Sequence, residues 1–525
     1  MRKFIGIFAA ALLVMSCDKG GTHIGSDGFL HDDGLQHGMI VLGSRLDNPY
    51  TTENARAAFS AVYPTKSRDI VQTTDLYVRF LPADQEEFDL LEDMGVEMLD
   101  HPMDYEIVAE GDYYHDPSVG EDNITWQYAV VDKDFDFPDG IRYEIIDECF
   151  LADNSETTKA MTDIDWEEVE KESYRLTGNE DMLDETALTK ATKYNPTGRI
   201  TIVDENANGG QPFGLAGVRV SCNTFIKFSS TYTDRDGYYT IPKRYSAKLR
   251  YRLVFKNAAG FSIGFNLVLV PASVSTLGKG PAQGINYTVS RACDDMLYRR
   301  SVVSNAAYDY ISRCSPDDMN LPAPPGDLRI WLFKSLSASS AVMIHHGAIV
   351  DNALVKSFLG VFSLLIKFFA PDITIGTQNH DSYAELYDST VHELAHSSHF
   401  AQVGTGYWNN YIRYILQSFI ETGGETYGVG DGEYAGHCEV GEMWAYYVES
   451  MMHKERYGGQ VPAYGTSSWF YPQIFRYLED RGLTRAQLLA ALQSDVTDKQ
   501  KLREKLVQLY PDRQIMIEQV FNRYR

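Results

Sequence analysis

Hydrophobic and polar positions along the chain divide it into regions that predict different elements. In residues 39–152, alternating runs at 76–81 and 127–131 predict strands, because alternate side chains of a strand face the same side of a sheet. Helical spacing at 53–62 and 84–94 predicts helices in the same region. Residues 39–152 are therefore expected to form a small α+β domain.

The next two regions differ from the first and from each other. Residues 153–196 are rich in acids around Val169 and Tyr174, which are spaced like the apolar stripe of a solvated helix, and they predict an acidic helical linker. Residues 197–290 hold alternating strands, such as 199–203, separated by Gly, Asp and Asn turns. This region predicts an all-β sandwich.

From residue 291 to 525 the pattern becomes helix-rich. An apolar segment at 358–370, interrupted by Lys367 and followed by Pro371, is too short to cross a bilayer and predicts a buried helix. Residues 371–376 predict a short strand. The whole chain is thus expected to be a multidomain α+β protein.

Composition limits the partners more than the fold. Apolar residues make up 44% and charged residues 23% of the chain, which is ordinary for a globular protein. The net charge of −26 repels nucleic acid phosphates and anionic membrane faces, so neutral or basic partners are expected and nucleic acid is not. Six cysteines in 525 residues are too few for a disulfide-built scaffold.

The N-terminal residues predict a signal peptide followed by a flexible tether. Basic residues precede an apolar run at 4–15, which is too short to span a bilayer and fits the apolar region of a signal peptide. The run ends V-M-S-C, which resembles a bacterial lipobox. The resemblance implies that residues 1–16 are removed and that Cys17 carries lipid and anchors the protein to a membrane. A flexible Gly- and Asp-rich tether is expected over 17–38.

The residues that carry chemistry stand at 392–396, where the chain reads H-E-L-A-H. Helical spacing places His392 and His396 one turn apart on one face, where two imidazoles can share a tetrahedral Zn²⁺. Glu393 is then directed toward the attacking water as a general base. Asp388 or Ser389 can cap the start of this helix. The motif predicts one zinc ion per chain and Glu393 as the catalytic residue.

Two flanking segments favour a site that cuts peptides. The predicted strand at 371–376 lies just upstream, where it is expected to be an edge strand that pairs with an extended peptide. Residues 439–449 predict a second helix with acids on one face.

With these two helices, the chain resembles the gluzincin branch of zinc metallopeptidases, in which the two histidines of HExxH and a glutamate on a later helix hold the metal. The resemblance covers roughly residues 328–459 and implies Glu442 as the third ligand. Gly441 and Ala445 flank it as small residues that let the two helices approach closely. The alternatives for the third ligand are Glu439, Glu421 and Glu425.

Three residues near the motif depart from familiar patterns. Tyr446 stands where many gluzincins have an aspartate, which leaves the partner of the first histidine unassigned. Gln402 stands where a metzincin has its third histidine, so the metzincin interpretation fails. His399 shares the helical stripe of the ligands and is expected to be a buried polar residue beside them.

Four further residues are candidates by position. His345 and His346 could reach the cleft, although histidines satisfied by hydrogen bonds are the simpler interpretation. Tyr434 and His437 stand just before the glutamate helix, where they are candidate donors of hydrogen bonds to an oxyanion.

The β-rich region also carries a resemblance. The pieces 198–200, 215–220 and 233–241, the last with T-D-R-D-G-Y-Y, resemble the transthyretin-like domain, also described as carboxypeptidase regulatory-like. The whole order, ending in the HExxH domain at 291–525, is similar to zinc metallopeptidase-type lipoproteins of Bacteroidetes outer membranes.

These resemblances imply a membrane-anchored zinc metallopeptidase of the cell envelope, expected at the outer membrane, that hydrolyses protein or peptide substrates. The alternative is a binding or assembly lipoprotein of a nutrient-uptake system, in which the zinc is structural.

Overall fold

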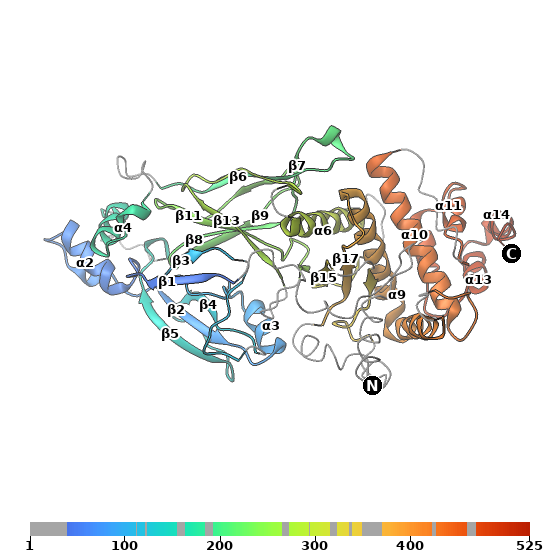
Figure 1. Cartoon of the computed structure of the whole chain (residues 1–525), viewed down its shortest axis with the longest axis horizontal. Helices are drawn as coiled ribbons and strands as arrows, with labels where there is room; N and C mark the ends of the chain where they lie inside the picture. The colour runs from blue at the N-terminus through green and yellow to red at the C-terminus, as the bar shows by residue number, and fades with distance from the viewer. Residues whose placement is uncertain are drawn as a thin grey trace.

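The computed structural model describes residues 39–111, 113–120, 123–154, 163–183, 193–264, 272–292, 295–315, 323–334, 339–348, 370–422, 427–458 and 469–524. The fold is mixed α+β, as the sequence predicts, with several sheets and a number of helices. Figure 1 shows an elongated molecule with the N-terminal elements at one end, sheets in the middle and the C-terminal helices at the other end. The predicted signal peptide, Cys17, the tether and most of the predicted helix at 358–370 lie outside the described residues.

The N-terminal unit has the expected helices and strands. Helix α2 (Thr52–Val62) begins where the Thr51 side chain accepts the Asn54 N–H, and α3 (Gln85–Asp93) begins where Asp84 accepts the Glu87 N–H. A three-stranded sheet has the order β4-β2-β5, and a second sheet pairs β1 with β3. The strands are β1 (Val41–Arg45), β2 (Asp75–Leu81), β3 (Tyr105–Ala109), β4 (Gln127–Asp132) and β5 (Arg142–Cys149).

Helix α4 (Trp166–Leu176) confirms the helix predicted in the acidic segment, and its predicted apolar stripe is the face that is buried. Val169 and Tyr174 are buried against the neighbouring elements. The carboxylate of Glu170 is also enclosed, and it lies 2.8 Å from Lys193 Nζ and accepts a hydrogen bond from Tyr50. The acids of this segment therefore include a buried charge that joins the N-terminal unit to the next region.

Residues 197–290 form two four-stranded sheets that contribute to one core. One sheet has the order β10-β6-β14 with β7 beside β6, and the other has the order β13-β11-β8-β9. The strands are β6 (Thr197–Ile202), β7 (Phe213–Gly214), β8 (Arg219–Thr224), β9 (Lys227–Tyr232), β10 (Tyr238–Thr240), β11 (Leu249–Val254), β13 (Val274–Gly280) and β14 (Tyr287–Val289). The predicted β-rich character of the region is confirmed.

A further sheet corrects the expected place of the strand at 371–376. The sheet has the order β12-β15-β17-β16, formed by Ser262–Ile263, Arg329–Phe333, Ile373–Gly376 and Ser340–Ala341 respectively. Strand β17 pairs with β15 on one side and with β16 on the other, so it is an inner strand and not an edge. Strand β16 runs antiparallel to β17 and forms the edge. Because β12 comes from the β-rich region, the sheet also crosses the expected domain boundary at residue 290.

The C-terminal region is dominated by two long helices, α9 (Tyr383–Thr422) and α10 (Ala435–Tyr457), which lie side by side (Figure 1). The start of α9 differs from expectation: Ser382, and neither Asp388 nor Ser389, accepts an N–H of its first turn. The other α-helices are α6 (Asp295–Arg313), α11 (Gln473–Glu479), α12 (Arg485–Ala490), α13 (Lys499–Leu509) and α14 (Gln514–Phe521). Short 3₁₀ turns are at Arg68–Ile70, Ala152–Asn154, Glu180–Met182, Asn208–Gly210 and Pro511–Arg513.

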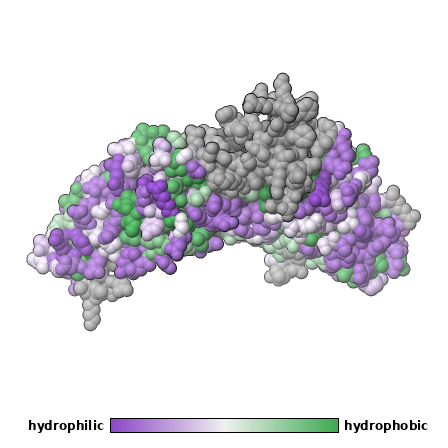
Figure 2. All heavy atoms as spheres, turned by 90° about the horizontal axis from the view of Figure 1, so that it is seen from below, coloured by the Kyte–Doolittle hydropathy of each residue, from purple (hydrophilic) through white to green (hydrophobic). Residues whose placement is uncertain are grey.

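One large hydrophobic core joins the β-rich region to α6, α9, α10 and the C-terminal helices. It fixes α9 and α10 from several sides. In the described part of the chain, no helix combines the length and apolar character needed to cross a bilayer. Figure 2 shows a largely hydrophilic face, with hydrophobic residues gathered on the half that carries the N-terminal unit.

Candidate metal centre

The packing of α9 against α10 brings together three side chains that could hold a metal ion. His392 and His396 come from α9, Glu442 comes from α10, and at most 2% of each residue is exposed. The His392 Nε2 lies 3.5 Å from Glu442 Oε2, and the His396 Nε2 lies 3.4 Å from Glu442 Oε1. The structure therefore unites the two histidines of the motif with the predicted third ligand.

A glycine makes this close helix packing possible. A Cβ added at Gly441 would lie 3.2 Å from the ring of Tyr411 and 3.9 Å from the ring of His396. An added side chain would therefore crowd the Tyr411 ring, which agrees with the predicted need for a small residue at Gly441.

A break within α9 completes the wall of the centre. Gly404 has φ 78° and ψ 174°, which is not helical, and the chain turns there. A straight helix would carry Tyr411 about 22 Å beyond His396 at ~1.5 Å per residue. The two ring centroids are 5.6 Å apart, and Trp408 lies 5.7 Å from the same histidine. The second half of α9 thus folds back over the motif.

Two tyrosines fix the carboxylate of Glu442. Tyr411 donates to Oε1 at 2.5 Å and Tyr427, from the segment before α10, donates to Oε2 at 3.2 Å. Neither tyrosine was predicted from the sequence. Nothing in the spacing signals them, because Tyr411 reaches the glutamate only through the break at Gly404.

The structure also supplies the partner of the first histidine that Tyr446 leaves unassigned. Glu449, on α10, lies with its Oε2 2.9 Å from His392 Nδ1. This contact holds the proton on Nδ1 and leaves Nε2 directed toward Glu442. Tyr446 instead packs edge-on against the ring of His392 at 4.6 Å. Glu449 follows Glu442 by two helical turns, so the spacing on one helix face could have indicated it.

The buried carboxylates set the charge of the centre. Burial lowers the pKa of His392, but hydrogen bonds and charge from Glu442 and Glu449 outweigh burial and raise this pKa to about 10. Burial lowers the pKa of His396. Burial also opposes ionisation of Glu442, yet the two histidines hold its pKa well below the usual range. The two carboxylates therefore favour positive charge in the centre, and a cation that binds there would displace the proton from His392.

The competing glutamates lie elsewhere. Glu439 accepts the backbone N–H of Lys499 at 3.0 Å and lies 3.4 Å from that residue's Nζ, so it fixes the start of α13. Glu421 accepts a hydrogen bond from Gln417 at the surface. Glu425 lies outside the described residues. Of the described candidates for the third ligand, Glu442 alone meets both histidines.

The remaining histidines of the region do not join this group. His399 is fully buried between Tyr407 and Trp408, and burial together with the charge of nearby histidines lowers its pKa to about 3. It is therefore the neutral buried residue that the sequence predicts. His345 and His346 lie in a separate group with Asp327.

Tyr434 and His437 stand at the start of α10, as predicted. Tyr434 precedes the helix with φ 68°, and its ring packs against His437 at 5.5 Å. The ring of His437 also packs against Tyr407 at 4.5 Å, and burial lowers its pKa to about 4. Their role as oxyanion donors stays a prediction.

Comparison of the chain with protein family models, curated proteins and solved structures finds no match.

Proposed function

We propose that this chain is a zinc-dependent peptidase in which His392, His396 and Glu442 hold the metal. The observation that carries the proposal is the convergence of these three side chains beside Glu393. Ligand atoms about 2.0–2.1 Å from a tetrahedral ion lie about 3.3–3.4 Å from one another. The separations of 3.4 and 3.5 Å from the histidine nitrogens to Glu442 fit that geometry.

The number of ligands supports a catalytic rather than a structural role. Three side chains of the described residues supply ligand atoms, whereas structural zinc sites commonly have four protein ligands. Three protein ligands leave a position for water or substrate. Zinc, when bound, acts as a Lewis acid on a substrate carbonyl and makes water a stronger acid.

The residues of the chain supply the rest of the chemistry. Glu393 follows His392 directly in α9 and is buried beside the group, so its carboxylate is suited to accept a proton from the attacking water and to pass it to the leaving amine. Glu449 orients His392. Tyr411 and Tyr427 orient Glu442 and keep its two oxygens directed at the histidines.

The test is hydrolysis of a broad peptide library by the wild type and by Glu393→Gln. The substitution keeps the shape of the side chain but removes the proton acceptor, so we expect unchanged zinc content and a loss of cleavage of at least about 100-fold. Glu439→Gln, which changes a glutamate of α10 outside the group, should cleave like the wild type. A wild type that holds zinc and cleaves nothing would instead support a binding lipoprotein with a structural zinc.

The expected location belongs to the same proposal. A lipid on Cys17 would anchor the peptidase to the cell envelope, at the outer membrane, with protein or peptide substrates in reach of the tether.

A further inference from the structure

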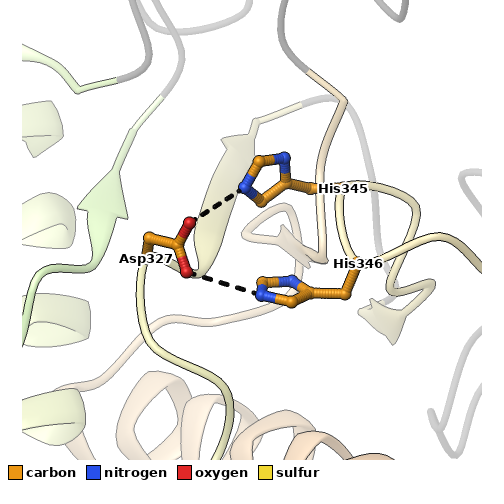
Figure 3. Close-up of side chains that lie close together, drawn as sticks. All are labelled: Asp327, His345 and His346. Atoms are coloured by element: carbon orange, nitrogen blue, oxygen red, sulfur yellow. Dashed lines mark hydrogen bonds and ion pairs between the residues drawn. The ribbon is translucent and has the colours of Figure 1, made fainter. Parts of the chain in front are cut away.

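A second group of side chains with metal-ligand chemistry lies outside the proposed catalytic centre. Asp327 precedes strand β15, and His345 and His346 lie in the turn after strand β16. Both imidazole rings point toward the carboxylate of Asp327 (Figure 3). The sequence alone favours hydrogen-bonded histidines at these positions and gives no signal for Asp327.

The ligand atoms of this group lie close to one another. His345 Nε2 lies 3.3 Å from Asp327 Oδ2, and His346 Nε2 lies 3.5 Å from Asp327 Oδ1. The two distances run to different oxygens of the carboxylate, and one ligand atom from each of the three side chains lies within 4.8 Å of the others, which is close enough to share one ion. Both distances also match the two separations around Glu442 in the first centre.

A buried carboxylate orients one of the histidines from behind. Asp372 is fully buried, and its Oδ1 lies 3.0 Å from His346 Nδ1. The same carboxylate accepts the backbone N–H groups of His346 and Arg329, each at 3.1 Å, and is therefore fixed. The negative charge of this carboxylate close to Nδ1 favours a proton on that nitrogen, which leaves Nε2 as the ligand atom.

The other histidine is oriented by the N-terminal unit. The side-chain amide of Gln85, on α3, lies 3.4 Å from His345 Nδ1. A rotated amide would present its oxygen to an Nδ1–H, because the two ends of an amide have the same shape. Arg329 extends the same contact by pairing with Asp89 of α3 at 3.0 Å. The group therefore lies where α3 meets the sheet that precedes the HExxH helix.

The exposure of the group also suits an ion. Asp327 lies in a turn with φ 52°, a left-handed conformation that Asp adopts more readily than most residues other than glycine. Its side chain is 71% exposed, whereas those of His345 and His346 are 16% and 21% exposed. An ion can therefore enter from solvent, and the open side leaves room for a water ligand.

We propose that Asp327, His345 and His346 form a second divalent-metal site. Two imidazoles and one carboxylate suit Zn²⁺ and related transition metals rather than Mg²⁺ or Ca²⁺. The site would join the N-terminal unit to the sheet beside α9, where the ring of His346 packs against Phe400, one turn beyond His396. It does not depend on the proposed peptidase activity.

The test is a titration of the metal-stripped full chain with Zn²⁺, monitored by calorimetry. A second titration uses Co²⁺ and is monitored by visible absorption. The wild type should bind two equivalents. The double variant Asp327→Asn/His345→Gln should bind one equivalent, at the centre of His392, His396 and Glu442. Glu442→Gln should also bind one equivalent, at the second site. His115→Gln, which changes a histidine bonded to the Asn123 carbonyl far along the chain from both groups, should still bind two.

A wild type that saturates at one equivalent, lost in Glu442→Gln and kept in the double variant, would overturn the second site. If the double variant does not fold by circular dichroism, Asp327→Asn alone decides. Its side chain is largely exposed, and we expect at least about tenfold weaker binding of one equivalent. Unchanged binding of both equivalents in Asp327→Asn would refute the role of this carboxylate.

Discussion

At the scale of single residues, the centre depends on which atoms are held in place before any ion arrives. His392 has Glu449 behind one ring nitrogen and Glu442 in front of the other. Glu442 in turn has a tyrosine hydroxyl on each oxygen. This arrangement reduces the reorganisation needed on binding, because each ligand is already oriented by a neighbour.

The first prediction separates the two neighbouring acids of α10. Glu442→Ala removes a ligand, so we expect zinc affinity to fall by at least about 10–100-fold, the range seen even for residues behind the ligands. Glu439→Ala should leave affinity within about twofold, because its carboxylate faces Lys499. Competition with a chromophoric chelator measures both. The opposite ranking would transfer the ligand role to Glu439.

At the scale of elements, the fold of α9 depends on one glycine. Gly404 has a φ and ψ that only glycine adopts readily, and no atom lies within 4 Å of the position of an added Cβ. An added methyl group would therefore meet backbone strain and no steric clash.

The second prediction follows from this geometry. Gly404→Ala should lower the free energy of unfolding by about 1–3 kcal/mol and weaken zinc binding, because the turn carries Tyr411 to Glu442. Gly406→Ala, two residues on within regular helix and in open space, should raise stability by up to about 1 kcal/mol. Urea denaturation measures both variants. Equal changes in the free energy of unfolding for the two substitutions would show that the fold does not require the break at Gly404.

The third prediction concerns α4 and the charge buried beneath it. Burial opposes ionisation of Glu170, but Lys193 and Lys227 outweigh it and lower the pKa from 4.5 to about 2. A lowered pKa in the folded state stabilises the fold above pH 4.5 and loses that effect as the pH falls toward 2. Glu170→Gln should therefore cost about 3 kcal/mol at pH 7 and progressively less below pH 4.5.

Denaturation of this variant at several pH values provides the measurement. Glu168→Gln is the matched control, since this acid pairs with Arg175 at the surface and should change stability by less than about 1 kcal/mol. A difference between Glu170→Gln and the wild type that stays constant from pH 7 to pH 3 would contradict the assignment of the buried charge.

The sequence predicted the elements whose pattern is local. Helical spacing identified the helix of His392 and the helix of Glu442, and a small residue at Gly441 indicated their close approach. Periodicity could not show that β17 is an inner strand, because its edge partner β16 is only two residues long and pairs at long range. It could not show the roles of Tyr411 and Tyr427 either, since these depend on the turn at Gly404.

At the scale of the whole molecule, the two candidate metal groups lie on the same structural unit. The sheet β12-β15-β17-β16 lies between the N-terminal unit and α9, and the turn that carries His346 contacts Phe400 of that helix. The shared core from the β-rich region to the C-terminal helices makes the HExxH helix part of a continuous body. The β-rich region and the C-terminal helices are therefore held together by side-chain packing.

The fourth prediction concerns the anchor. With lipid on Cys17, the mature protein should sediment with membranes and need detergent for extraction, whereas Cys17→Ser should give a form released without detergent with the same circular dichroism spectrum. A tether over residues 18–37 would have a reach of roughly 25 Å. Release of the wild type by salt alone would exclude a lipid anchor. Protease treatment of intact cells would then show whether the body faces the exterior or the periplasm.

The central claim is that His392, His396 and Glu442 hold one zinc ion. Anomalous diffraction from crystals of the purified full chain, measured at the zinc absorption edge, tests it most directly. We predict a peak about 2.0–2.1 Å from the Nε2 atoms of His392 and His396 and from the carboxylate of Glu442. A protein that contains zinc but gives no peak between these three side chains would contradict the account.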